Sequence, residues 1–174
     1  SPHHRPTPRG VVRIWRLPPL SHLDDRQDAG LLVENYLLST LDQGLYHPDG
    51  QIQDEVFVHG SFLQSKMYQA GVTCSDCHNP HSLELRLPGD GVCLQCHQAN
   101  QYQTPKHHFH STAAGSACVD CHMPETTYME VDPRRDHSLR VPRPDLSVTL
   151  GTPNACNQCH TDQSAEWAAE HVQQ

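Results

Sequence analysis

The cysteines of this chain all belong to one short repeated pattern. The sequence holds eight cysteines and fifteen histidines, and every cysteine lies in a copy of Cys-x-x-Cys-His. The copies are motif 1 (Cys74, Cys77 and His78), motif 2 (Cys93, Cys96 and His97), motif 3 (Cys118, Cys121 and His122) and motif 4 (Cys156, Cys159 and His160). This pattern is the attachment signature of c-type haem, in which both thiols add to the porphyrin and the adjacent imidazole binds iron. The motifs therefore predict four covalently bound haems.

Zinc and disulfide bonds are the alternative uses of paired cysteines. The separation of Cys77 from Cys93 also suits a four-cysteine zinc site. A site built from four thiolates has no use for a histidine after each second cysteine, and the later gaps do not repeat the zinc spacing. A disulfide framework gives no reason for that histidine either. Haem is therefore favoured over both.

The composition suggests that something other than side chains fills the interior. Hydrophobic residues make up 36% of the chain and the mean hydropathy is -0.65, whereas globular proteins are about 45–50% apolar. Fourteen prolines and ten glycines indicate many turns. Porphyrins supply large apolar surfaces, so a chain with few aromatic residues can pack around them.

Charge and hydropathy exclude two classes of partner. The formal net charge is -8, and no basic stretch is long enough to follow a nucleic-acid backbone. No apolar run reaches the about 18 residues of a membrane span, so we expect no transmembrane segment. The chain opens without the charged and apolar regions of a signal peptide, so we expect that such a peptide was removed or that this is a piece of a longer product.

The remaining elements are expected to be short. Residues 1–28 are predicted to form an extended arm, rich in proline and arginine at its start, and residues 29–174 a tetrahaem domain. Periodicity predicts helices over 29–43, 56–70 and 164–173, a short helical turn at each motif, and mostly coil over 123–153. The expected fold class is mostly coil with short α-helices wrapped around four c-type haems, with little or no β-sheet.

Each iron needs a second axial ligand, and histidines outside the motifs are the candidates. His81 follows His78 on the same side of the porphyrin, so it can serve only another haem, unless it is a surface residue of a turn. The other candidates are His59, a possible helix histidine, His137, and the cluster His107, His108 and His110, of which one or two are expected to be ligands.

Four segments carry a resemblance to a known group. They are GSFLQSKM (60–67), GVTCSDCHNPH (71–81), CVDCHMP (118–124) and RRDHSLRVPRPD (134–145). These resemble multihaem c-type cytochromes of the lineage related to hydroxylamine oxidoreductase and pentahaem nitrite reductase. The resemblance implies bis-histidine haems, with His81 and His137 as distal ligands. In haem density the chain is also similar to extracellular tetrahaem cytochromes that form wires.

Electron transfer without catalysis is the predicted activity. Two imidazoles on each iron leave no open position for a substrate, whereas an enzyme of the nitrite or hydroxylamine type needs one. We expect a subunit of an extracellular filament, made of copies of this chain and exchanging electrons with a redox protein or an extracellular acceptor. The alternatives are a multihaem oxidoreductase and a soluble monomeric periplasmic shuttle. The location is expected to be extracellular or periplasmic.

Overall fold

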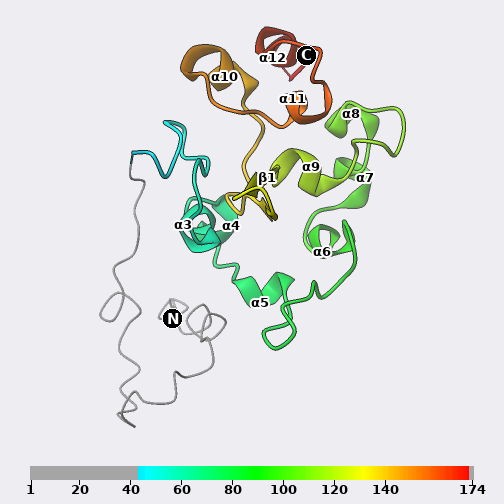
Figure 1. Cartoon of the computed structure of the whole chain (residues 1–174). Helices are drawn as coiled ribbons and strands as arrows, with labels where there is room; N and C mark the ends of the chain where they lie inside the picture. Colours follow the sequence, from blue (N-terminus) through cyan, green and yellow to red (C-terminus); the bar gives the residue numbers. More distant parts are fainter. Residues whose placement is uncertain (1–42, 173–174) are drawn as a thin grey trace, which may run out of the picture.

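The computed structural model describes residues 43–172, which form short helices joined by turns (Figure 1). The expected arm over 1–28 and nearly all of the expected helix over 29–43 lie outside this range. The helices are α3 (Val58–Leu63), α4 (Lys66–Gln69), α5 (Cys74–Cys77), α6 (Gly91–Leu94), α7 (Ala99–Tyr102), α8 (Pro105–His108), α9 (Cys118–His122), α10 (Pro144–Leu150), α11 (Cys156–Cys159) and α12 (Ala165–Val172). No helix among residues 43–172 is long and apolar enough to cross a membrane.

Two of the three helices expected from periodicity fall within the described range, and both are present with shifted boundaries. The one predicted over 56–70 is divided into α3 and α4, because Ser65 caps the second piece and accepts a hydrogen bond from the Tyr68 amide at 3.0 Å. The last helix, α12, begins after Ser164, whose hydroxyl accepts from the Trp167 amide. Helices α5, α9 and α11 begin at the first cysteine of a motif, whereas α6 begins before Cys93.

Residues 123–153 contain more regular structure than the sequence predicted. An antiparallel hairpin pairs β1 (Glu125–Tyr128) with β2 (Asp132–Arg135), in a register that sets Glu125 opposite Arg135. It is followed by α10, which packs against α12 near the C-terminal end of the fold. The prediction of mostly coil missed these elements, since Pro133 and Pro144 suggest breaks in the sequence but occupy a strand and a helix start. The two-stranded sheet still agrees with the expected fold class.

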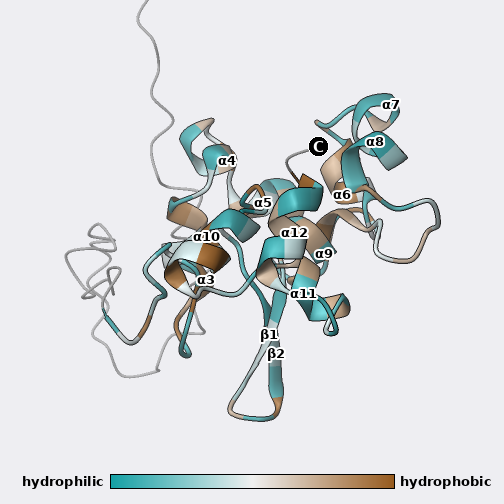
Figure 2. Ribbon diagram, turned by 90° about the horizontal axis from the view of Figure 1, so that it is seen from above, coloured by the Kyte–Doolittle hydropathy of each residue, from teal (hydrophilic) through white to brown (hydrophobic). Residues whose placement is uncertain are grey.

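The apolar core of the described region is small. Tyr46, Ile52 and Tyr128 form a buried cluster, against which Leu45 and Val56 pack. Figure 2 shows hydrophobic residues scattered along the ribbons of many elements. Leu83, Leu85 and Leu87 are exposed on the loop after motif 1, with 57%, 46% and 41% of their surface accessible. Such side chains offer the apolar surface that a porphyrin buries.

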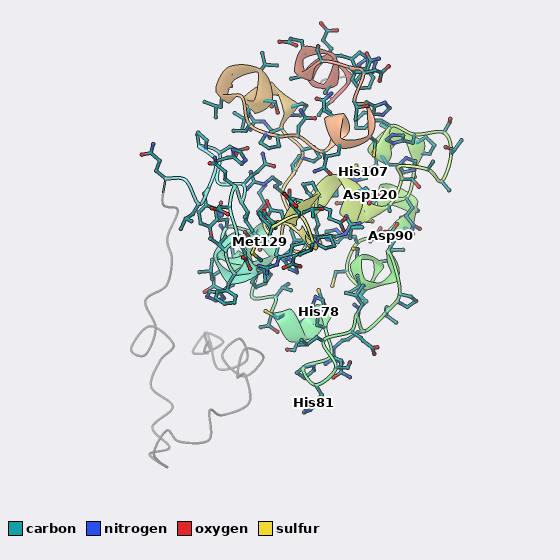
Figure 3. All side chains as sticks on the ribbon, viewed as in Figure 1. His78, His81, Asp90, His107, Asp120 and Met129 are labelled. Atoms are coloured by element: carbon teal, nitrogen blue, oxygen red, sulfur yellow. The ribbon has the colours of Figure 1, made fainter. Side chains whose placement is uncertain are left out.

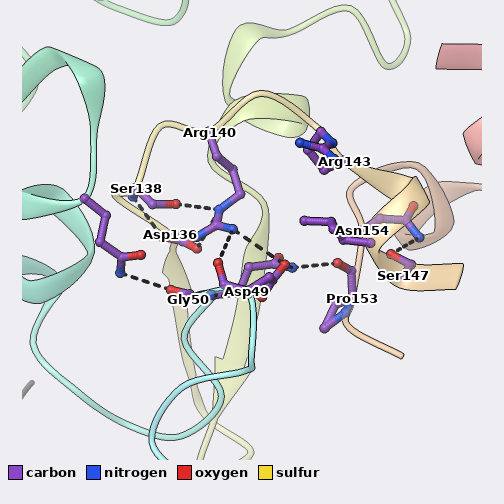
Figure 4. A network of polar contacts seen from close by, with 12 residues as sticks. Asp49, Gly50, Asp136, Ser138, Arg140, Arg143, Ser147, Pro153 and Asn154 are labelled. Atoms are coloured by element: carbon purple, nitrogen blue, oxygen red, sulfur yellow. Dashed lines mark hydrogen bonds and ion pairs between the residues drawn. The ribbon is translucent and has the colours of Figure 1, made fainter. Parts of the chain in front are cut away.

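A polar network centred on Arg140 joins segments that are distant in sequence (Figure 4). Its guanidinium lies 3.6 Å from the Asp49 carboxylate and 3.9 Å from that of Asp136, and its Nε donates to the Ser138 hydroxyl at 2.8 Å. The Asp49 and Asp136 side chains are only 4% and 9% exposed. Because buried carboxylates need a counter-charge, Arg140 fixes the loop 136–140 against residues 47–51.

Arg140→Gln should therefore destabilise the fold. It leaves two buried carboxylates without a cation, and we expect a loss of about 3 kcal/mol, at the low end for breaking a buried ion pair. Denaturant unfolding of the haem-loaded protein measures this loss. Arg143→Gln is the matched control, because Arg143 pairs with Asp145 at an exposed site and should have little effect. Equal denaturant midpoints of unfolding for the two variants would contradict the proposed role of the network.

Candidate haem sites

Local hydrogen bonds form the turns that present the cysteine pairs. At motif 1 the Thr73 amide donates to the Asp76 carboxylate at 2.7 Å, and Asp76 and Thr73 together form a capping box at the start of α5. The His78 amide then donates to the Cys74 carbonyl at 2.8 Å. The same bond recurs from His97 to Cys93 and from His160 to Cys156. One helical turn thus places both thiols and the following imidazole together.

Three of the motif histidines face a second histidine ring. His78 and His137 have ring centroids 6.3 Å apart with planes at 29°. His122 and His107 are 5.9 Å apart at 18°, and His160 and His110 are 6.0 Å apart at 18°. In each pair one ring comes from a motif and the other from a segment outside the motifs.

The spacing of these rings fits an iron between them. Nitrogen ligands bind a metal at about 2 Å, so two imidazoles on opposite sides of one iron have centroids about 6 Å apart. Burial lowers the pKa of His137 and, with the neighbouring His122 as the next cause, that of His107. A lowered pKa keeps the imidazole neutral, which is the form that binds a metal. The residues present therefore fit haem with two axial histidines.

Backbone carbonyls orient several of the paired rings. Nδ1 of His78 lies 2.8 Å from the Leu83 carbonyl oxygen, and Nδ1 of His137 lies 2.9 Å from that of Arg135. His122 makes the same contact with the Arg140 carbonyl at 2.9 Å, and His110 with that of His108. A carbonyl at Nδ1 fixes the proton there and leaves Nε2 free for iron.

Successive motifs are neighbours in space. Burial raises the pKa of the Cys77 thiol, and the next cause is Cys93 of motif 2. Burial and then Cys93 raise the pKa of Cys118 to about 12. Burial and then Cys156 raise that of Cys121. Since such effects act only over short distances, the motifs follow one another in the order 1, 2, 3, 4.

Asp90 connects motif 2 to motif 3 directly. It stands at the start of α6, and its carboxylate accepts a hydrogen bond from the Cys118 amide at 3.0 Å. Figure 3 shows Asp90 between the elements that carry the two motifs. The contact fixes α9 relative to α6 and hence the relative positions of the two thiol pairs.

A left-handed residue separates two histidines that serve different motifs. Phe109 ends α8 with φ at 62°, a conformation that few residues other than glycine adopt. The turn directs His107 toward His122 and His110 toward His160. Gly115 also has a positive φ, and a Cβ there would lie 2.9 Å from Nε2 of His110. The approach of this loop to His110 thus requires glycine.

The other candidate histidines are not paired with a motif histidine within the described region. His81 is exposed, and Figure 3 shows it at the outer end of the loop after α5. The ring of His108 stacks on that of His110, with centroids 6.3 Å apart. His59 has a buried Nδ1 without a hydrogen-bond partner, and burial lowers its pKa. Their roles as iron ligands stay predictions.

Two aromatic residues contact histidines at these sites, and the sequence reasoning did not connect either of them with a haem. Tyr102 makes edge contacts with His97 at 5.2 Å and with His107 at 5.1 Å. The ring centroid of Trp167 lies 4.9 Å from that of His160 and 4.3 Å from that of His171. The available signal was their place a few residues after motifs 2 and 4.

The proteins to which this chain is similar are cytochromes. The family model of cytochrome c552 matches residues 94–174. A crystal structure of the outer cell wall cytochrome OcwA has the same fold, with a TM-score of 0.59 and 18% sequence identity. The match covers 82% of this chain and 43% of OcwA, so the chain spans less than half of that protein's length. No curated protein matches.

The chain has the motifs and the fold of multihaem c-type cytochromes. The described region consists of short helices and one hairpin, and four of these helices carry cysteines of the repeated Cys-x-x-Cys-His motifs. The cytochrome c552 match covers motif 3 and motif 4 in full and begins within motif 2.

Replacing His107 should affect one iron selectively. His107→Ala removes the ring opposite His122, so one low-spin haem should become high-spin and bind carbon monoxide. His108→Ala is the matched control, since His108 faces no motif histidine in the described region. Visible and electron paramagnetic resonance spectra measure both changes. A low-spin spectrum retained in H107A, or lost in H108A instead, would refute this ligand assignment.

Proposed function

We propose that the protein carries electrons along a row of four covalently bound c-type haems. The observation that supports this most strongly is the set of parallel histidine pairs at 5.9–6.3 Å opposite motifs 1, 3 and 4. Haem iron supplies a reversible one-electron change when bound. The paired imidazoles would hold these irons from both sides, which would close them to substrates and keep the ligand set unchanged between oxidation states.

The protein side chains determine where the electron-carrying groups lie. The eight motif cysteines would hold the porphyrins through their thiols, and the closeness of thiols from successive motifs supports a row of haems in sequence order. The Arg140 network fixes both His137 and the carbonyl that contacts His122. We infer that this rigid support keeps the distances between successive sites constant, which electron transfer along a row requires.

A multihaem oxidoreductase is the second candidate function. The observation that favours it is His97, which has no parallel histidine partner among residues 43–172 and instead meets the edge of Tyr102. An iron held by His97 alone would keep a position open for a substrate. A histidine outside the described range would close it, and we favour closure because the chain contains three histidines in residues 1–42.

Mass and spectroscopy test these proposals together. The intact protein should carry the mass of four haems, and Cys121→Ala should lose or loosen one while three remain. The ferric spectrum should be wholly low-spin, without carbon monoxide binding after reduction. Carbon monoxide binding at one haem would favour the oxidoreductase. Zinc, or no added mass, would refute the haem assignment.

We further propose that the protein is exported and works as a filament subunit at the cell exterior. The similar protein OcwA is an outer cell wall cytochrome, and c-type haem in related proteins is attached outside the cytoplasm. The partners would be other copies of the chain and a redox protein or an extracellular electron acceptor. The monomeric periplasmic shuttle is the alternative form of the same carrier.

Filament formation depends on the arm over residues 1–28. This segment has too few apolar residues to form a core, and an interface with the next copy would cover it. Electron microscopy and sedimentation at micromolar concentration should show open polymers for the full chain. Deleting residues 1–28 should abolish them while four haems are kept. A stable monomer of the full chain with four low-spin haems would refute the filament.

A further inference from the structure

We propose that Tyr102 is a positioning residue shared by two haem sites, where its ring orients both His97 of motif 2 and His107 opposite motif 3. This inference rests on the proposed electron-carrier function and its ligand assignment. It assigns to one side chain the orientation of axial ligands on two different irons.

Tyr102 contacts two histidine rings with nearly the same distance and angle. The ring centroids of Tyr102 and His97 are 5.2 Å apart with planes at 86°. Those of Tyr102 and His107 are 5.1 Å apart with planes at 88°. In such edge-to-face pairs the positive edge of one ring meets the negative face of the other, so the contact fixes orientation as well as distance. Tyr102 therefore restrains the two imidazoles together.

The backbone around Tyr102 is built to bring these rings together. The Tyr102 amide donates to the Gln98 carbonyl at 3.0 Å, beside His97. Helix α7 ends at Tyr102, and α8 begins at Pro105, which suits a first helical position. The His107 amide donates to the Thr104 carbonyl at 2.8 Å. The chain thus turns back on itself, with Tyr102 midway between the two histidines.

Tyr102 replaces the support that other ligands receive from the backbone. His78, His137, His122 and His110 each have a carbonyl oxygen at Nδ1. Within residues 43–172 the rings of His97 and His107 have no hydrogen-bond partner, and Tyr102 is the aromatic ring that contacts both. An axial imidazole can rotate about its bond to iron unless something restrains it. The ring of Tyr102 supplies that restraint on both sides.

This arrangement has an electronic consequence at the two sites. A carbonyl that accepts the Nδ1 proton raises the basicity of an imidazole and favours ferric iron. His97 and His107 lack this contact in the described region, so they are weaker donors than His78 and His137. Removing Tyr102 changes the plane of both imidazoles and should therefore alter the spectra and the reduction potentials of two haems together.

The experiment compares Tyr102→Leu with Tyr102→Phe in the haem-loaded full chain. Electron paramagnetic resonance reports the angle between axial imidazole planes, and a potentiometric titration reports the potentials. We expect Y102L to shift the low-spin signals and potentials of two of the four haems. Y102F keeps the ring and should match the unmodified protein. The signal lost in His107→Ala identifies the motif 3 haem, which must be one of the two.

Tyr68→Leu is the control for losing a tyrosine elsewhere. Tyr68 makes an edge contact with Phe62 at 5.7 Å, in α4, and its loss should leave all four signals unchanged. If Y102L does not mature with its haems, Tyr102→Met, which keeps an apolar side chain of similar length, is measured in its place. Unchanged spectra in the Leu or Met variant, or equal changes in Y102F, would overturn the proposal.

The controls separate this proposal from the function on which it rests. A haem count below four in the unmodified protein, or high-spin iron at motif 3, would refute the carrier assignment before any variant is measured. Four low-spin haems in the unmodified protein, combined with no effect of Y102L, would refute only the role of Tyr102.

Discussion

The structure is organised around one geometric requirement, which a metal between two histidines would impose: the imidazole rings face each other, nearly parallel and about 6 Å apart. The chain meets it at three places with rings from different segments, such as His78 after α5 and His137 after β2. Each pair must be held against rotation and against separation. Much of the remaining structure, including the hairpin, the αL turn at Phe109 and the carbonyl contacts at Nδ1, provides that support.

Polar contacts stabilise the fold in places where an apolar core usually would. The buried cluster of Tyr46, Ile52 and Tyr128 is small for the length of chain described. The Arg140 network instead joins residues 47–51 to the loop that carries His137. Ion pairs with buried carboxylates are costly to form without good geometry, yet they fix one arrangement rather than several. A site that must keep two rings in register benefits from such specificity.

The motifs, each with its own histidine, could be identified from sequence because their spacing is local. The four Cys-x-x-Cys-His copies specify both thiols and the first imidazole, and three of these copies coincide with helix starts. The opposite ring could not be assigned from the residues alone, since its identity depends on contacts between distant segments, and the resemblance named His137 without the motif that it faces. His107 and His110 face motif histidines and His108 does not, and this follows from the positive φ of Phe109, which no periodicity reveals. His81, implied by resemblance, lies at an exposed loop end, and Tyr102 gave no motif signal.

The three histidine pairs also define how the chain is threaded. The pair His107–His122 closes a short loop that lies inside the longer loop closed by His78 and His137. The pair His110–His160 closes a third loop that begins inside the second and ends beyond it. If an iron joins each pair, the loops nest and interleave, so that no loop can expand independently of its neighbours. The haem-loaded protein should consequently unfold as a single cooperative unit rather than motif by motif.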